Sequence, residues 1–181
     1  MHHHDVVAHP CIFDPAYLLG RAGGSLFSSR CAEISASPKL SGIFRHRPLD
    51  PNHPLLRGFD EVFYMPHSRY TEVREYDIDK VSELYTLALS ETAGAAIVAT
   101  RDARQVFVTG HCEYDRCTLA NEYQRDIKRG INPAVPQHYF PDDNPESVPP
   151  MLWRGHANLL ISNWLNYFVY QQTPYDFVDA T

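Results

Sequence analysis

Cysteine is scarce in this sequence, and its four cysteines follow none of the strong metal-binding patterns. Cys11, Cys31, Cys112 and Cys117 are spaced too irregularly for a zinc finger or ribbon. A site built from His111, Cys112 and Cys117 would rest on the weak C-x4-C spacing alone, so we predict no metal centre. Without a secretory signal, these cysteines are expected to be free thiols.

The sequence also lacks a long uncharged apolar run, an excess of positive charge and a secretory start. No apolar run approaches the length of a membrane span, so we expect no membrane partner. The formal net charge of -6 argues against a surface that binds nucleic acid. The first residues, MHHHDVVAHP, have neither a basic flank nor a long apolar core, so a cytoplasmic location is expected.

What the sequence does contain is the pattern of one domain with both strands and helices. Its 181 residues are enough to bury a single core. Short apolar runs predict strands at residues 40–44, 61–65, 86–90, 95–100 and 105–109. A turn is expected at residues 66–68, and a proline-rich loop at residues 133–150. Helices are predicted over residues 115–128 and 153–171, and the second is amphipathic, so it should pack on the core or on a partner.

Candidate functional residues gather directly after the strand at residues 105–109. His111 and Glu113 follow Thr109 and Gly110. The carboxyl end of a buried strand is a favourable place for a base and for the carboxylate that orients it. Arg125, on the predicted helix, can hold a carboxylate-bearing substrate. This segment therefore offers a base, an orienting acid and an anchor, but no evident nucleophile.

Each of these residues also has an ordinary structural interpretation. Glu113 could be a carboxylate in the first turn of a helix, where the helix dipole favours it. Arg125 could pair with Glu122 or Asp126 on a solvated face. Cys112 adjoins the histidine, but neighbouring side chains of an extended segment point to opposite faces, so we do not expect it to be the nucleophile.

Four long segments carry a resemblance to a known family: KLSGIFRHRPLDPNHPLLRGFD, PHSRYTEV, VFVTGHCEYDRCTLANEYQRDI and NLLISNWLNYFVYQQTPYD. From Lys39 onward the chain closely resembles the homoserine O-succinyltransferases, also called homoserine O-acyltransferases. The resemblance implies an α/β fold like that of class I glutamine amidotransferases, a mostly parallel, flavodoxin-like sheet with helices on both faces. It covers the carboxyl-terminal part of the family, so the sheet should be incomplete on its amino-terminal side.

The resemblance also implies a reaction and the residues that carry it. A cysteine thiolate takes an acyl group from succinyl-CoA or acetyl-CoA, and the hydroxyl of L-homoserine then attacks the thioester, an early step in methionine biosynthesis. His111 resembles the family's proton acceptor and Glu113 its acidic partner. Arg125, Lys39 and Ser68 match substrate-binding positions. No cofactor is expected beyond the acyl-CoA co-substrate, and a homodimer is a conceivable assembly.

The family's nucleophilic cysteine is missing from its expected place. Counting back from Lys39 by the family's spacing leads to Leu18, in AYLLGRAGGSLF, where no thiol is found. With plausible codons, a one-base shift turns this stretch into HICWAAQA, which is the family's nucleophile motif. We therefore divide the chain into a frame-shifted, poorly ordered segment at residues 1–38 and a family segment at residues 39–181. The chain alone is expected to be inactive, and the alternative is a non-catalytic remnant that acts as a binding or dimerisation module.

Overall fold

The computed structural model describes residues 17–19 and 33–171 of the chain. Six strands form one curled sheet in these ranges. The strands are β1 (Tyr17–Leu19), β2 (Glu33–Pro48), β3 (Phe63–Val73), β4 (Leu84–Ser90), β5 (Gly94–Thr100) and β6 (Val106–Val108). The helices are α2 (Glu75–Asp79), α3 (Thr118–Lys128), α4 (Arg154–Trp164), the short 3-10 turns η1 (Pro54–Leu56) and η2 (Pro141–Asp143), and the π-helical turn η3 (Leu165–Tyr170).

The order of strands across the sheet is β1-β6-β5-β4-β2-β3, and every neighbouring pair is antiparallel. The expectation of a mostly parallel sheet is therefore wrong for the described residues, whose one parallel contact is an isolated bridge between Gly42 and Gln137. The connections explain why. Residues 91–93 join β4 to β5, and residues 101–105 join β5 to β6. Such short loops can link only antiparallel strands, since a parallel crossover needs a dozen residues or more.

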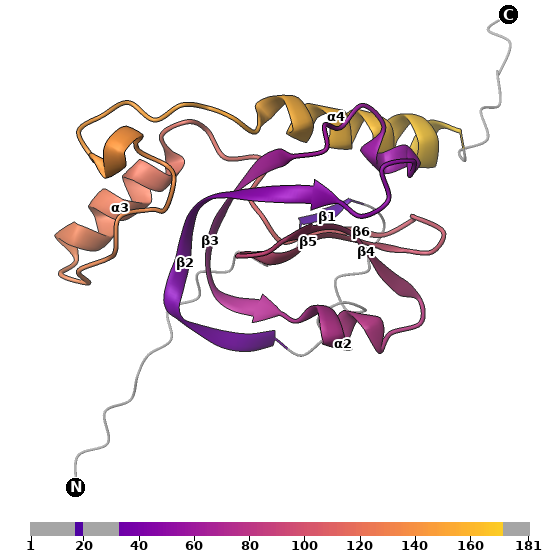
Figure 1. Cartoon of the computed structure of the whole chain (residues 1–181), viewed down its shortest axis with the longest axis horizontal. Helices are drawn as coiled ribbons and strands as arrows, with labels where there is room; N and C mark the ends of the chain where they lie inside the picture. The colour runs from indigo at the N-terminus through magenta and orange to yellow at the C-terminus, as the bar shows by residue number, and fades with distance from the viewer. Residues whose placement is uncertain (1–16, 20–32, 172–181) are drawn as a thin grey trace, which may run out of the picture.

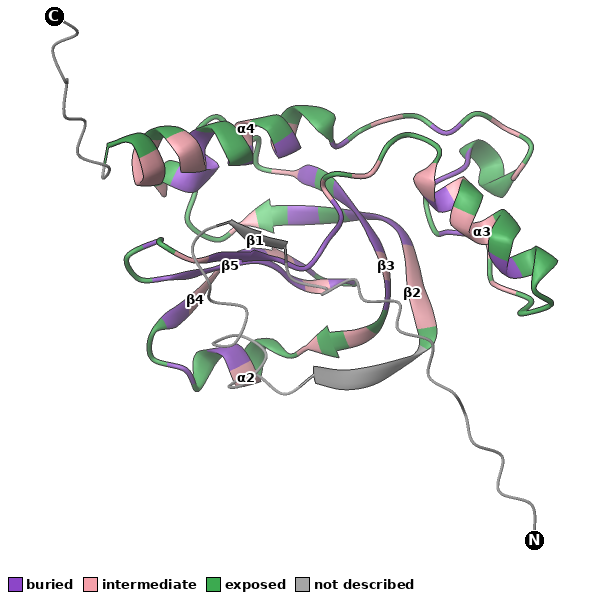
Figure 2. Cartoon of the chain, turned by 180° about the vertical axis from the view of Figure 1, so that it is seen from behind, coloured by how far each residue is buried: buried purple, intermediate pink, exposed green. Residues whose placement is uncertain are grey.

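Helices cover the sheet on opposite sides and at one end, as Figure 1 shows for α4, α2 and α3. On the α4 side, Leu160 packs with buried side chains of η1, β3 and β5. On the α2 side, Ile78 packs with Val98 of β5 and Phe107 of β6. A third cluster joins α3 to β2 and to the loop before α4 through Leu119, Ile43 and Trp153. Figure 2 shows the purple, buried residues concentrated on the strands between these helices.

Most predicted elements are confirmed, with one clear exception at the second strand. The predicted turn at residues 66–68 is wrong, because β3 continues to Val73. Pro66 is tolerated there because its missing N–H costs no ladder bond and its carbonyl accepts a hydrogen bond from the N–H of His111 at 2.7 Å. The helix expected from residue 115 begins at Thr118, and the one expected over residues 153–171 is observed as α4 followed by η3.

No helix in residues 33–171 has the length and apolar character needed to cross a membrane. The expected low order of residues 1–38 concerns positions that lie mostly outside the described residues. Of that segment, the structure describes the backbone of β1 and of the first residues of β2, and β1 pairs with β6 so that Leu18 lies opposite Phe107.

Candidate functional site

The end of β6 places His111 and Glu113 in direct contact. The Thr109 N–H bonds to the Ala96 carbonyl at 3.0 Å, and its hydroxyl donates to the Ala95 carbonyl at 2.7 Å. These bonds hold the chain against β5 up to the residue before Gly110. The buried His111 then places its Nδ1 2.9 Å from Glu113 Oε1. A carboxylate can only accept, so the neutral imidazole carries its proton on Nδ1 and leaves Nε2 as the basic nitrogen.

A second cluster is centred on Glu122, in the second turn of α3. Glu122 Oε2 accepts a hydrogen bond from the Ser68 hydroxyl and lies 3.4 Å from Lys39 Nζ. Its Oε1 accepts a bond from the Tyr114 hydroxyl at 2.9 Å. The structure thus brings together Lys39 and Ser68, two residues predicted from the resemblance, on a carboxylate that was considered only as a surface partner of Arg125.

Tyr114 connects this second cluster to the histidine. Its ring stacks on the His111 ring with centroids 4.2 Å apart and planes 12° apart. Its backbone carbonyl accepts a hydrogen bond from Trp153 Nε1 at 2.9 Å. Burial and the charge of Glu122 raise the pKa of Tyr114 far above its usual value, so the phenol keeps its proton and remains the donor.

Arg125 lies three residues after Glu122 on α3 and binds Asp126. Its Nε and Nη2 lie 2.9 Å and 2.8 Å from Asp126 Oδ1, while Lys39 Nζ lies 3.5 Å from Oδ2 of the same carboxylate. The pairing of Arg125 with Asp126, which was the structural interpretation of this arginine, is therefore observed. Asp126 is buried, whereas 44% of the Arg125 side chain is exposed, so the guanidinium lies at the surface end of this cluster.

Glu122 and Tyr114 are the two members of the site that the sequence reasoning missed. One signal was available for the first. Glu122 and Asp126 are four residues apart, so they share a face of the helix, and two carboxylates on one face call for a cation such as Lys39. No local pattern marks Tyr114, because its role depends on contacts with residues distant in the chain.

Cys112 lies in a turn that the hydrogen bond from the Tyr114 N–H to the His111 carbonyl closes at 3.2 Å, so the extended segment expected here is not observed. Its side chain packs against the core cluster beneath α4. Burial, together with the nearby charge of Glu113, raises the pKa of its thiol to about 11. At neutral pH Cys112 is therefore a protonated thiol and a poor nucleophile. Cys117 is exposed, and Cys11 and Cys31 lie outside the described residues.

The position expected for the missing nucleophile lies in β1, next to the strand that leads to the histidine. Leu18 pairs with Phe107, and Tyr17 with Val108, the last residue of β6. Among residues 17–19 and 33–171, no three histidine, cysteine or acidic side chains are grouped so as to bind a metal ion.

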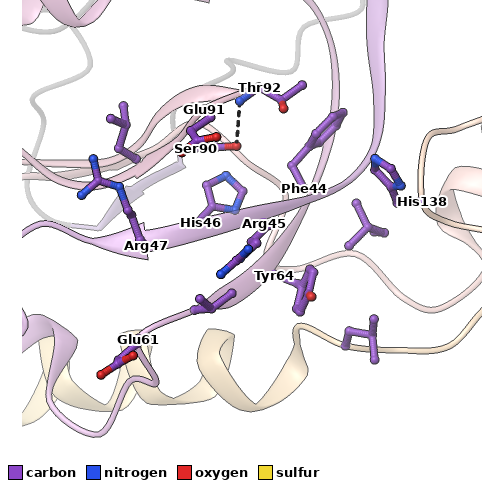
Figure 3. A pocket seen from close by; sticks show the side chains of 14 residues that line it. Phe44, Arg45, His46, Arg47, Glu61, Tyr64, Ser90, Glu91, Thr92 and His138 are labelled. Atoms are coloured by element: carbon purple, nitrogen blue, oxygen red, sulfur yellow. Dashed lines mark hydrogen bonds between the residues drawn. The ribbon is translucent and has the colours of Figure 1, made fainter.

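Two hollows lie near these residues. A small one of about 200 Å³ is bounded by Lys39, Asp126, Tyr70, Tyr123 and the loop at residues 131–137. It adjoins the expected substrate-binding residues and has room for a small amino acid. A larger groove of about 760 Å³ lies over β2, β3 and the β4–β5 turn, and contains none of the predicted site residues. Figure 3 shows its lining, with His46 of β2 pointing toward Ser90 and Glu91, and Arg45 on the other side of the strand near Tyr64.

Comparison with solved structures bears on the fold alone. The structure of SMU.1228c matches with a TM-score of 0.51 at 12% identity, over 75% of this chain and 55% of that chain. A glutamine amidotransferase from Thermotoga maritima matches with a TM-score of 0.47 at 11% identity, over 75% of this chain and 54% of that one. The first of these shares the fold, and the α/β class expected from the sequence is confirmed.

Comparison with curated protein sequences is more specific. A homoserine O-acetyltransferase from Methanomassiliicoccus intestinalis is 61% identical over 138 residues, 76% of this chain and 45% of that protein. A homoserine O-succinyltransferase from Aliivibrio fischeri is 54% identical over 138 residues, 76% of this chain and 44% of that protein. The chain thus spans less than half the length of these relatives. The model of the family described as homoserine O-succinyltransferase matches residues 19–175. With this match over most of its length, the chain belongs to the homoserine O-succinyltransferase family.

Proposed function

We propose that this chain is the part of a homoserine O-acyltransferase that binds L-homoserine and moves its proton. The observation that carries the proposal is the 2.9 Å contact between His111 Nδ1 and Glu113 Oε1, joined through the Tyr114 ring to the Lys39–Ser68–Glu122 cluster. A base oriented by a carboxylate lies beside a polar cluster, which is the arrangement that general-base activation of a bound hydroxyl requires.

The proposed reaction has two acyl transfers. His111 takes the proton of the cysteine thiol, the thiolate attacks the thioester carbonyl of an acyl-CoA to form an enzyme thioester, and CoA leaves as its thiol with the proton that the imidazolium returns. The homoserine hydroxyl then attacks that thioester while His111 Nε2 takes the hydroxyl proton, and the cysteine sulfur leaves. Glu113 stabilises the imidazolium that forms. The acyl donor is acetyl-CoA or succinyl-CoA, and the setting is methionine biosynthesis in the cytoplasm.

The thiol needed for the first step is not among the described cysteines. Cys112 is half-buried and the pKa of its thiol is raised, and Cys117 is an exposed thiol. We propose that the nucleophile is hidden by a change of reading frame before Lys39, with its codon across Leu18 and Leu19. The nucleotide sequence tests this directly: a frame that does not yield HICW after a one-base shift contradicts it.

Without that thiol, the purified chain should not release CoA from succinyl-CoA or acetyl-CoA in the presence of L-homoserine. A thiol-reactive chromophore measures free CoA, and mass spectrometry of the protein detects an acyl adduct. The homoserine O-succinyltransferase of Aliivibrio fischeri is the positive control for the assay. Sustained CoA release by this chain, or an acyl adduct on one of its cysteines, would show that it contains a working nucleophile after all.

Binding of L-homoserine does not need the thiol, so it tests the substrate site separately. Titration calorimetry should detect binding to the chain, and Arg125→Ala should weaken it by about tenfold or more, since a charge-assisted bond to the substrate carboxylate is lost. Lys128→Ala is the matched control, because Lys128 is an exposed cation on the same helix. If both variants lose the same affinity for L-homoserine, Arg125 contributes only positive charge and makes no specific bond to the substrate carboxylate.

A second candidate function is a non-catalytic module that binds a partner or a second copy through α4 and η3. Apolar side chains on this segment remain exposed, namely Ile161 and Tyr170. Sedimentation separates the two functions: a stable dimer with no homoserine binding supports the module, whereas homoserine binding that depends on Arg125 supports the acyltransferase site.

A further inference from the structure

Two buried histidines lie next to the site, and the proposed chemistry does not use them. His46 on β2 and His67 on β3 are 1% and 0% exposed. Their Nε2 atoms are 3.1 Å apart, and the rings stack with centroids 5.1 Å apart and planes 19° apart. One Nε2 must therefore donate its proton to the other, which requires that the two neutral rings adopt opposite tautomers.

His67 is in contact with the segment that carries His111. A Cβ placed on Gly110 would lie 2.9 Å from His67 Nε2 and 2.2 Å from Met65 Sδ, so only a glycine lets the backbone approach this closely. The carbonyl of Pro66, the residue before His67, accepts the hydrogen bond of the His111 N–H. The His67 ring thus lies against Gly110, the residue before the proposed base.

His67 also lies between the two halves of the site along β3. The residue before it anchors His111, and the residue after it, Ser68, donates to Glu122. The partner ring of His46 is fixed in turn by stacking on Phe63, with centroids 5.3 Å apart. A movement of the His67 ring would therefore disturb the base and the substrate cluster together.

The charges around the pair favour its neutral form. Burial lowers the pKa of His46 to about 4 and that of His67 well below its usual value. Arg69 lies beside both rings and opposes a positive charge on either, and His111 opposes one on His67.

Building on the proposed function, we propose that His67, hydrogen-bonded to His46, is a positioning residue for His111. Its ring holds the Gly110–His111 backbone so that Nδ1 of the base stays on Glu113 and Nε2 stays unprotonated and available. The pair would thus act on the tautomer of His111 without touching the substrate.

Nitrogen-detected NMR of the full chain, labelled in its histidine rings, tests this without any assay of activity. In the unchanged chain His111 should be found as its Nδ1-protonated tautomer near neutral pH. His67→Gln should change the ratio of the two His111 tautomers by about tenfold, because the bond between His111 Nδ1 and Glu113 is released. His46→Phe keeps the stacking but removes the partner nitrogen, and it should cause a smaller change in the same direction.

Amide spectra report whether each variant is folded, and His138→Asn is the control because His138 is exposed and has a positive φ that asparagine tolerates. Folded His67→Gln and His46→Phe chains with an unchanged His111 tautomer would overturn the proposal. Unfolding of both would overturn it too, because the pair would then serve the core rather than the site. If only homoserine binding fails, the result counts against the proposed function, and the NMR result on the His111 tautomer still decides the positioning role of His67.

Discussion

Replacing Gly42 with alanine should destabilise the chain by at least about 3 kcal/mol, or prevent folding. Gly42 has a φ of 148°, and a Cβ there would lie 2.3 Å from the carbonyl oxygen of Gln137 and 2.7 Å from its nitrogen. Both obstacles are backbone atoms, which cannot turn aside as a side chain can. Hydrogen bonds join β2 to the loop that contains Gln137, from the Ile43 N–H to the Gln137 carbonyl and from the Gln137 N–H to the Ser41 carbonyl, at 2.9 and 2.8 Å.

Urea denaturation measures the effect of this change. Gly155→Ala is the matched control, because nothing lies near the added methyl group and the residue is helical. That control should leave the free energy of unfolding unchanged or raise it by up to about 1 kcal/mol. A Gly42→Ala chain as stable as the control would mean that the loop containing Gln137 does not pack on β2 in solution.

Acidification should destabilise the chain steeply, because the buried histidine pair resists protonation. The folded-state pKa of His46 is about 4, below the value of about 6.5 expected in the unfolded chain. The unfolded state therefore binds the extra proton, and stability that is complete above pH 6.5 falls as the pH drops toward 4. The loss is about 1.4 kcal/mol per pH unit from this residue. Burial and the neighbouring cations lower the pKa of His67 in the same direction.

Unfolding free energies measured at several pH values test this prediction. In His46→Phe the slope of stability against pH should fall by about one proton between pH 4 and 6.5. His138→Asn should keep the slope of the unchanged chain, because His138 is exposed and lies outside the buried pair. An identical slope in all three chains would show that water reaches His46.

The sequence predicted the strands and helices well where local patterns carry the information. The apolar runs that became β4 and β5 are bounded by turn residues, and the helix that became α4 has a consistent apolar face. The direction of strand pairing was not readable from these runs, because it depends on which segments meet in space. The extension of β3 through Pro66 was missed for a similar reason: proline usually ends a strand, and the bond that makes it acceptable comes from His111.

In the candidate site, too, the sequence predicted the local contacts and missed those between distant segments. His111 and Glu113 are close in the sequence, so their contact followed from the motif. Lys39 and Ser68 were placed by the resemblance, and the carboxylate that joins them, Glu122, emerged only from the packing of α3 against β2 and β3. The roles of these residues in binding and catalysis remain predictions that the experiments above decide.

The antiparallel arrangement has a consequence for the order in which the chain assembles. The strands β4, β5 and β6 follow one another through short loops, so their contacts close small loops at little entropic cost and should form early. His111 is attached to the end of this meander, whereas Lys39 and Ser68 belong to β2 and β3. Base and substrate cluster come together only when the two parts have docked, and a partly folded chain cannot present both.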